Sequence, residues 1–375
     1  MRVLQFAKRS VVTVALVSMS LAGCGGESTP DAPFNPSGTT ADLQAMNSTF
    51  ASPAFASFST FSFMFDAALG GAPIIATSTA ALDIRGKTPQ GMRAAAVRTA
   101  QRLAATLRPS SGTRMSTSSS VHGGQALAAV PPEVAGKTFV YDAATGSYAA
   151  STRTGAPSNG VRFILYAVDP VSYAPVDPLT ETGHVDLIDL SGGATQAARV
   201  VVVSGGITYI DYTASASSTS TSGRVSVIGM VTDGTNQATI NLLSTVTYTG
   251  GLSLTYSLDL PQRDVSIDLT ISSDNISQPE GTIVINLTMR GPNGTVAMSG
   301  QFTETSGTVN VRVNGSAFAT ITTDGVTTSI TRTDGNPMTD EDYAALQGVF
   351  EVQAGAFIAF DSMLAPVGAF FTEPQ

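Results

Sequence analysis

The chain has 375 residues, enough for one large domain or two, and 28 acidic against 19 basic residues give it a formal charge of −9. This acidic balance argues against nucleic acid as a partner and against electrostatic adhesion to anionic lipid. A single Cys excludes an internal disulfide. A hydrophobic core must therefore hold the fold, and 42% of the residues are hydrophobic.

Residues 1–23 have the layout of a secretory signal peptide. Three basic residues precede or flank the start of the mostly apolar stretch 10–22, and small residues stand directly before Cys24. The apolar stretch is shorter than the roughly 20 residues that a membrane-spanning helix needs. Removal of this segment would take away three basic and no acidic residues, which changes the formal charge from −9 to −12.

The run Leu21-Ala22-Gly23-Cys24 resembles the lipobox of bacterial lipoproteins. The resemblance implies cleavage before Cys24 and several acyl chains, such as palmitate, on the new N-terminus. One chain binds a membrane only reversibly, so several would make attachment effectively permanent. Gly25 stands where enteric members retained at the inner membrane carry Asp, which favours the outer membrane. We expect a cell-envelope protein held by lipid on Cys24; an ordinary secreted protein is the alternative.

Residues 24–40 are rich in Gly, Ser, Thr and Pro and are expected to form a flexible tether. The segment 41–108 is expected to be helical. Phe58, Phe61 and Phe65 follow helical spacing there, and this apolar face could touch lipid or an apolar ligand. Packing of the same face against a sheet is the favoured interpretation.

A second helix is predicted over residues 88–107, with Thr88 as its cap. Its arginines could contact a membrane surface, but a solvated helix face explains them more simply. The Ser-rich segment 109–136 is predicted to be a low-complexity linker.

The segment 137–333 changes to a period of two, which is typical of half-buried strands. In the run 252–260, Leu and Tyr alternate with Ser, Thr and Asp. Turn signals such as Asn314-Gly315 recur between such runs. The pattern predicts about thirteen to fifteen strands in an antiparallel meander. A membrane-spanning barrel alternates in the same way, but it would carry aromatic girdles that this chain lacks.

Residues 338–365 are predicted to form a C-terminal helix. Thr339 is a candidate N-cap, acids follow in the first turn, and the helix has a broad apolar face. The candidate ligand-facing residues on this helix are Phe350, Phe357 and Phe360.

The predicted fold is mainly β (α+β). Because twist accumulates along a meander, we expect a strongly curved sheet or an incomplete barrel, packed by the N-terminal helical segment and the C-terminal helix. This plan is similar in architecture to LolA/LolB/LppX-type lipid carriers, although no sequence motif carries the likeness.

Candidate chemistry is sparse. His184 and Asp186 share one strand face and could contribute to a metal site or to a hydrolase, although no nucleophile is identifiable nearby. Asp334, Asn336 and the acids at 340–342 gather oxygen ligands but do not match a calcium loop, and a turn with a helix cap explains them.

The sequence favours a lipid-anchored, non-enzymatic protein that is structural or binds an apolar ligand between sheet and helices. No cofactor and no bound metal is expected. An interaction or adhesion module that uses the Ser- and Thr-rich outer face is the alternative, and a hydrolase that uses His184 is the less favoured one.

Overall fold

The computed structural model describes residues 130–169, 174–193, 195–275, 281–303, 305–324 and 326–349, together with positions 35, 37, 38, 41, 57, 58, 61 and 363. The predicted signal peptide, Cys24, most of the tether, the helix at 88–107 and residues Phe65, Phe350, Phe357 and Phe360 lie outside these ranges.

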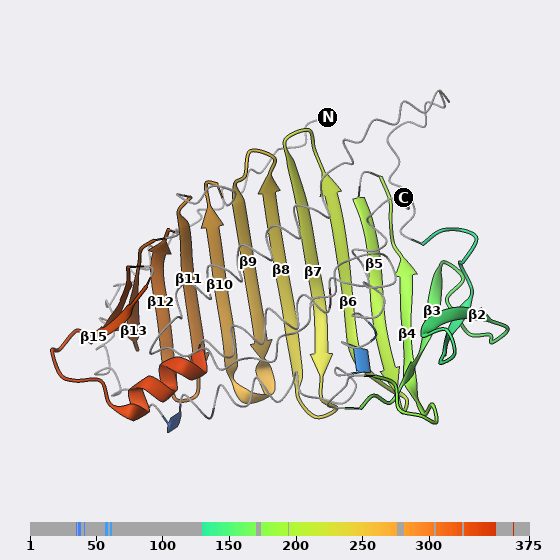
Figure 1. Ribbon diagram of the computed structural model, residues 1–375, viewed down its shortest axis with the longest axis horizontal. Helices are drawn as coiled ribbons and strands as arrows, with labels where there is room; N and C mark the ends of the chain where they lie inside the picture. Colours follow the sequence, from blue (N-terminus) through green and yellow to red (C-terminus); the bar gives the residue numbers. More distant parts are fainter. Residues whose placement is uncertain are drawn as a thin grey trace, which may run out of the picture.

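One sheet of fifteen strands dominates the described chain, and the strands follow one another in sequence order from β15 to β3, then β1 and β2 (Figure 1). The prediction of a mainly β, largely antiparallel meander is confirmed. The strands are β1 (Thr138–Asp142), β2 (Ser147–Ser151), β3 (Gly160–Tyr166), β4 (Glu181–Asp189), β5 (Thr195–Ser204), β6 (Ile207–Ser218), β7 (Ser222–Thr232), β8 (Gln237–Thr247), β9 (Leu252–Leu260), β10 (Val265–Ser273), β11 (Ile283–Gly291), β12 (Gly294–Phe302), β13 (Gly307–Val313), β14 (Ser316–Thr323) and β15 (Thr328–Arg332).

The alternation of the sequence sorts side chains onto two faces of the sheet. On β9, Leu254 and Leu258 are buried while Ser253 and Thr255 between them are exposed. The antiparallel register places Leu258 beside Ile267 of β10, so buried positions line up across strands. One face is therefore apolar and buried, and the other, the polar face, is rich in Ser and Thr.

Tight turns join neighbouring strands at the positions that the sequence marks. Between β13 and β14, Asn314 and Gly315 have φ values of 49° and 85°. Asn and Gly adopt this left-handed conformation at the least cost, which makes them the preferred pair for a two-residue hairpin. The Asn314 side chain also accepts a hydrogen bond from the backbone N–H of Thr295, at 2.8 Å. The turn is thereby fixed to the neighbouring strand β12.

The expectation of a strongly curved sheet or incomplete barrel is wrong, because the sheet is not strongly curled and its end strands β2 and β15 do not pair (Figure 1). β-Bulges supply the bends that sheet curvature requires. Among the described strands, irregular registers occur between β3 and β4, β5 and β6, and β13 and β14. From β6 to β13 the ladders run without interruption, and the central strands lie side by side in Figure 1.

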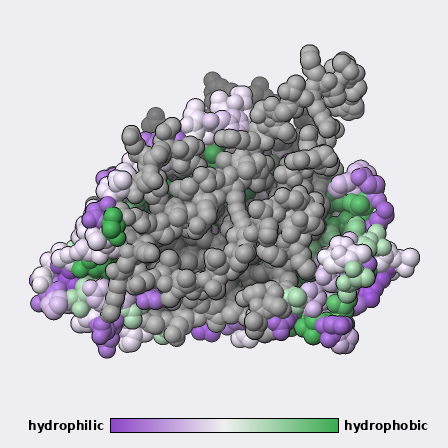
Figure 2. Space-filling view, viewed as in Figure 1, coloured by the Kyte–Doolittle hydropathy of each residue, from purple (hydrophilic) through white to green (hydrophobic). Residues whose placement is uncertain are grey.

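The meander also departs from a purely antiparallel order at one end. β1 pairs with β2 antiparallel but with β3 in parallel, through Thr138 beside Arg162 and Phe139 beside Phe163. The hairpin β1–β2 therefore continues the sheet beyond β3, and the chain crosses from β2 back to β3. Residues at both ends of the sheet are visible in the space-filling view, where hydrophilic and hydrophobic residues are mixed (Figure 2).

Residues 340–349 form the described part of the C-terminal helix, which lies beside the far end of the sheet (Figure 1). Its predicted cap is confirmed. The Thr339 hydroxyl accepts a hydrogen bond from the backbone N–H of Asp342 at 3.1 Å, and the Asp342 carboxylate accepts one from the backbone N–H of Thr339 at 3.0 Å. This reciprocal arrangement is a capping box. Arg332 of β15 donates to the same buried carboxylate at 3.0 Å, so the helix start is tied to the sheet edge.

Candidate functional site

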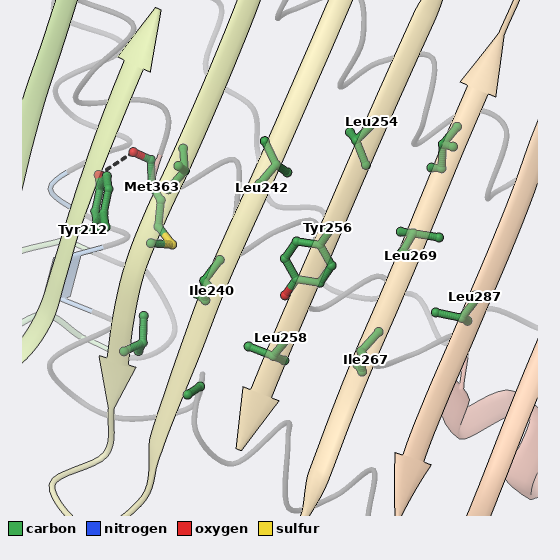
Figure 3. Close-up of a cluster of buried hydrophobic side chains, with 14 of the residues drawn as sticks. Tyr212, Ile240, Leu242, Leu254, Tyr256, Leu258, Ile267, Leu269, Leu287 and Met363 are labelled. Atoms are coloured by element: carbon green, nitrogen blue, oxygen red, sulfur yellow. Dashed lines mark hydrogen bonds between the residues drawn. The ribbon is translucent and has the colours of Figure 1, made fainter. Parts of the chain in front are cut away.

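The broadest candidate site is the apolar face of the sheet. Its central part lies on β6–β12, where every face position carries an uncharged residue. Neighbouring strands present their side chains side by side (Figure 3). The residues drawn and labelled there on β8–β11 are Ile240, Leu242, Leu254, Tyr256, Leu258, Ile267, Leu269 and Leu287.

Phe58 and Phe61 lie against this face near the β3 end. Both are helical, with relative exposures of 0% and 1%. The Phe61 ring centroid is 5.0 Å from that of Phe163 and 5.7 Å from that of Tyr148, and Phe58 packs edge-on against Tyr212 at 6.4 Å. Of the three N-terminal candidates, these two pack on the sheet as the favoured interpretation predicts.

Met363 reaches the apolar face from the C-terminal part of the chain. Its carbonyl accepts a hydrogen bond from the hydroxyl of Tyr212 on β6, and both residues are buried (Figure 3). Burial raises the pKa of the Tyr212 hydroxyl well above its ordinary value, so the group stays a neutral donor. Nothing in the alternation of β6 predicts this contact, because the partner atom belongs to the backbone.

A buried hydroxyl on the apolar face lacks a hydrogen-bond partner. Ser244 of β8 is fully buried and its oxygen has none. An unpaired buried hydroxyl costs about 1–3 kcal/mol. Sequence reasoning missed it, although Ser244 interrupts an apolar row between Leu242 and Val246 and was visible as an exception. Tyr256 of the neighbouring strand β9 lies on the same face and is 5% exposed.

Burial raises the pKa of Tyr256 above that of an ordinary phenol, which leaves its proton available for donation at neutral pH. In Figure 3 the hydroxyl points toward Ile240 and Leu258, which offer it no acceptor. Besides Ser244, the described residues with a buried unpaired hydroxyl are Thr138 on β1, Thr182 on β4 and Ser273 at the end of β10.

The His184–Asp186 pair lies on the polar face, where Arg162 engages the carboxylate. Arg162 of β3 donates two hydrogen bonds to the Asp186 carboxylate, each 2.7 Å long. His184 Nε2 is 3.8 Å from Asp186 Oδ2, which is too far for a hydrogen bond. Burial and the Arg162 charge lower the pKa of His184, although Asp186 opposes them. The carboxylate is therefore engaged in a cross-strand ion pair, which gives a hydrolase hypothesis no support.

The acids expected near a calcium loop are engaged in structural contacts. Asp334 accepts hydrogen bonds from Arg332 at 2.9 Å and from the backbone N–H of Asn336 at 3.0 Å, and these lower its pKa. Asp342 serves the capping box and Arg332. Within the described ranges, no group of three or more His, Cys, Asp or Glu residues is placed to hold a metal ion.

The polar face carries regular cross-strand pairs. Arg199 and Asp211 form an ion pair at 2.6 Å, and the hydroxyls of Ser215 and Ser226 lie 2.7 Å apart. Among the large apolar side chains on the described strands, Ile228 of β7 is the most exposed, at 57%. Pairs of this kind keep the face soluble and fix the register of the strands.

Known proteins offer no guide to this chain, since no family model, no curated protein and no solved structure matches it. Among the described residues, no helix has both the length and the apolar character needed to cross a membrane.

Proposed function

We propose that this chain is a lipid-anchored protein of the bacterial cell envelope that acts without catalysis and binds an apolar ligand against the apolar face of its sheet. The observation that carries the proposal is the breadth of that face. It runs across β6–β12, and the charged side chains of those strands lie on the polar face instead.

The open form of the sheet supports a ligand-binding role. A closed barrel of small size fills its interior with its own side chains, whereas an open sheet presents its apolar face to whatever lies against it. Among the described residues outside the sheet, the apolar core includes Phe58, Phe61, Val130, Leu346, Val349 and Met363. An apolar ligand bound against this face would lie on the same Leu, Ile and Val side chains.

The proposed anchor rests on the sequence around Cys24. Lipid on this residue would keep the protein at a membrane, where apolar ligands are concentrated, and Gly25 favours the outer membrane. Metabolic labelling with palmitate tests this part: the label should enter the chain and be lost in Cys24→Ala. Equal labelling of the two chains would refute the anchor.

Ligand binding is tested with the full mature chain, purified in mild detergent and stripped of lipid. The probes are N-phenylnaphthylamine, a neutral dye that fluoresces in apolar surroundings, and lipid extracted from the same envelope. We expect saturable dye fluorescence that the extracted lipid displaces. Absence of both effects in a folded protein would leave the apolar face a purely structural core and would refute ligand binding.

An interaction or adhesion module is the second candidate, and the polar face favours it. That face offers hydroxyls on many strands and the exposed side chain of Ile228. Cross-linking in intact envelopes through a photoreactive residue at Ile228 tests this role. A single adduct formed there, and none from a probe at exposed Val326 in the β14–β15 loop, would support the module.

A further inference from the structure

The N-terminal part of the chain contacts the β11–β12 turn through Gly38. The side-chain amide of Asn293 in that turn donates a hydrogen bond to the Gly38 carbonyl, at 3.3 Å. Asn35 accepts hydrogen bonds from the Ser37 hydroxyl at 3.1 Å and from the backbone N–H of Gly38 at 3.0 Å, and residues 37, 38 and 41 are helical. Asn35 therefore caps the start of a helix, and that start lies against the β11–β12 turn (Figure 1).

Gly38 suits this contact because it has no side chain. A Cβ atom at this position would lie 2.6 Å from side-chain atoms of both Asn293 and Asn35, closer than such atoms approach in real proteins. A larger residue would therefore push the helix start away from the turn. The contact holds the N-terminal part of the chain at a known position on the sheet, so the distance from that position to Cys24 can be bounded.

The β11–β12 turn lies at one end of the strands, which we call the near end. Because successive strands run in opposite directions, the β5–β6, β7–β8, β9–β10 and β13–β14 turns share this end, along the lower edge of Figure 1. Neighbouring turns there are bonded to each other. Arg263 donates to the Asn236 side chain at 3.2 Å, and the backbone N–H of Thr295 donates to the Asn314 side chain at 2.8 Å. The near end is therefore a row of short turns with bonds between neighbours.

The number of residues between Cys24 and Asn35 limits how the sheet can sit above a membrane. Eleven peptide bonds separate the two residues, and such a length cannot span more than about 40 Å in any conformation. Strands β7 and β8, with 11 residues each, are about 36 Å long. If lipid holds Cys24 at a membrane, the near end is always within reach of that surface. The opposite, far end reaches it only when the intervening chain is almost straight.

We propose that the near end faces the membrane and that the far end, which carries the β6–β7 and β8–β9 turns, points away from it. This inference rests on the lipid anchor of the proposed function and adds the orientation in which the anchor holds the sheet.

A sheet that lay with its polar face on the lipid is the competing arrangement. Attraction to lipid head groups needs an excess of basic residues. The charges of the polar face on β6–β13 balance instead, three acidic against three basic: Asp211, Asp259, Asp268, Arg224, Arg290 and Arg312. The polar face therefore gives the lipid surface nothing to attract, and the contact at Gly38 decides the orientation.

The test uses the lipidated full mature chain in phosphatidylcholine vesicles that contain a trace of rhodamine-labelled lipid. Cys24 is the single Cys and its thiol is blocked by acylation, so an introduced Cys can be labelled selectively with a fluorescent donor. Thr235→Cys puts the donor in the β7–β8 turn at the near end. The matched Ser220→Cys puts it in the β6–β7 turn, at the far end of the same strand, and both positions are exposed.

Energy transfer to the labelled lipid should be at least about twofold more efficient from position 235 than from position 220, since one strand length of about 36 Å separates them. Gly38→Leu should remove this difference, because the next ring contact of the N-terminal part with the sheet is at Phe58, 34 positions after Cys24. Gly192→Leu is the matched control, since a Cβ there meets nothing within 4 Å, and it should keep the difference.

Three outcomes would contradict the proposal at different levels. Vesicle-bound protein that transfers energy equally from both positions, or more from position 220, would overturn the orientation and leave the anchor in place. A difference that persists in Gly38→Leu would show that the Gly38 contact does not set the orientation, and would also overturn the inference. A folded chain that does not float with the vesicles would overturn the anchor itself.

Discussion

The two faces of the sheet are built from the same strands and differ in what holds them together. On the apolar face, Leu258 and Leu242 are buried at 0% and 1% exposure within rows of neighbouring Leu and Ile side chains. On the polar face, Arg290 and Asp268 pair across strands with about half of each side chain exposed. The comparison teaches that burial supplies the stability of this fold, while the polar face fixes register and solubility.

The largest expected effect on stability comes from truncating an apolar residue on the apolar face. The comparison is with truncation of an apolar residue on the polar face. Leu258→Ala removes a buried side chain and should lower the free energy of unfolding by about 2–5 kcal/mol. Ile228→Ala, at 57% exposure, should change it by no more than about 0.5 kcal/mol. Denaturant unfolding followed by circular dichroism measures both. Equal losses of unfolding free energy in the two variants would contradict the claim that burial on the apolar face supplies the stability.

The next comparison lies within the polar face. Asp186 is 12% exposed in its pair with Arg162, whereas Asp268 is 52% exposed in its pair with Arg290. Asp186→Ala leaves the partly exposed Arg162 guanidinium without its partner and should cost about 1–3 kcal/mol. Asp268→Ala should cost at most about 1 kcal/mol. Unfolding free energies at low and high salt check this, since only the exposed pair is screened.

A smaller effect separates the two buried tyrosines. Tyr212→Phe removes the hydrogen bond to the Met363 carbonyl and should cost about 1–2 kcal/mol. Tyr256→Phe leaves this bond intact and should cost less. Thermal midpoints of the two variants give the comparison. A larger loss in Tyr256→Phe would show that its hydroxyl is already paired.

The smallest effect concerns pH. Burial and Arg162 hold the pKa of His184 below its ordinary value, so the unfolded chain binds the proton more readily than the folded one. Stability from this group is therefore complete above about pH 6.5, the unfolded pKa, and is lost as the pH falls below it. His184→Gln should flatten the decline in unfolding free energy between neutral and mildly acidic pH. If the unfolding free energy declines with pH as steeply in His184→Gln as in the original chain, His184 is not the group responsible.

Much of the fold could be predicted from local pattern. The alternation in residues 252–271 places Leu258 and Ile267 on one face because the side-chain period of a strand is fixed. Thr339 and the acids that follow it identify the start of the C-terminal helix, because an unpaired backbone N–H requires a nearby acceptor. Both features depend only on residues close together in the sequence, so they can be predicted from the sequence alone.

The overall form of the sheet could not be predicted in the same way. Curvature depends on bulges, and these depend on one-residue shifts between strands, such as the one at Leu165/Tyr166, that no local pattern marks. The parallel pairing of Phe139 with Phe163 and the contact between Tyr212 and Met363 join residues far apart in the chain. The buried, unpaired Ser244 was visible in the sequence as a polar residue within an apolar row.

The most direct test of the central claim uses the absence of Trp from the chain. One Trp is introduced at Tyr256 on the apolar face or, in the matched control, at Thr255 on the polar face. A monoacylglycerol with a brominated acyl chain, which quenches Trp on contact, is then added to each full mature chain. Binding against the apolar face predicts saturable quenching of Tyr256→Trp and none of Thr255→Trp. Equal quenching of both, or quenching of Thr255→Trp alone, would contradict the account.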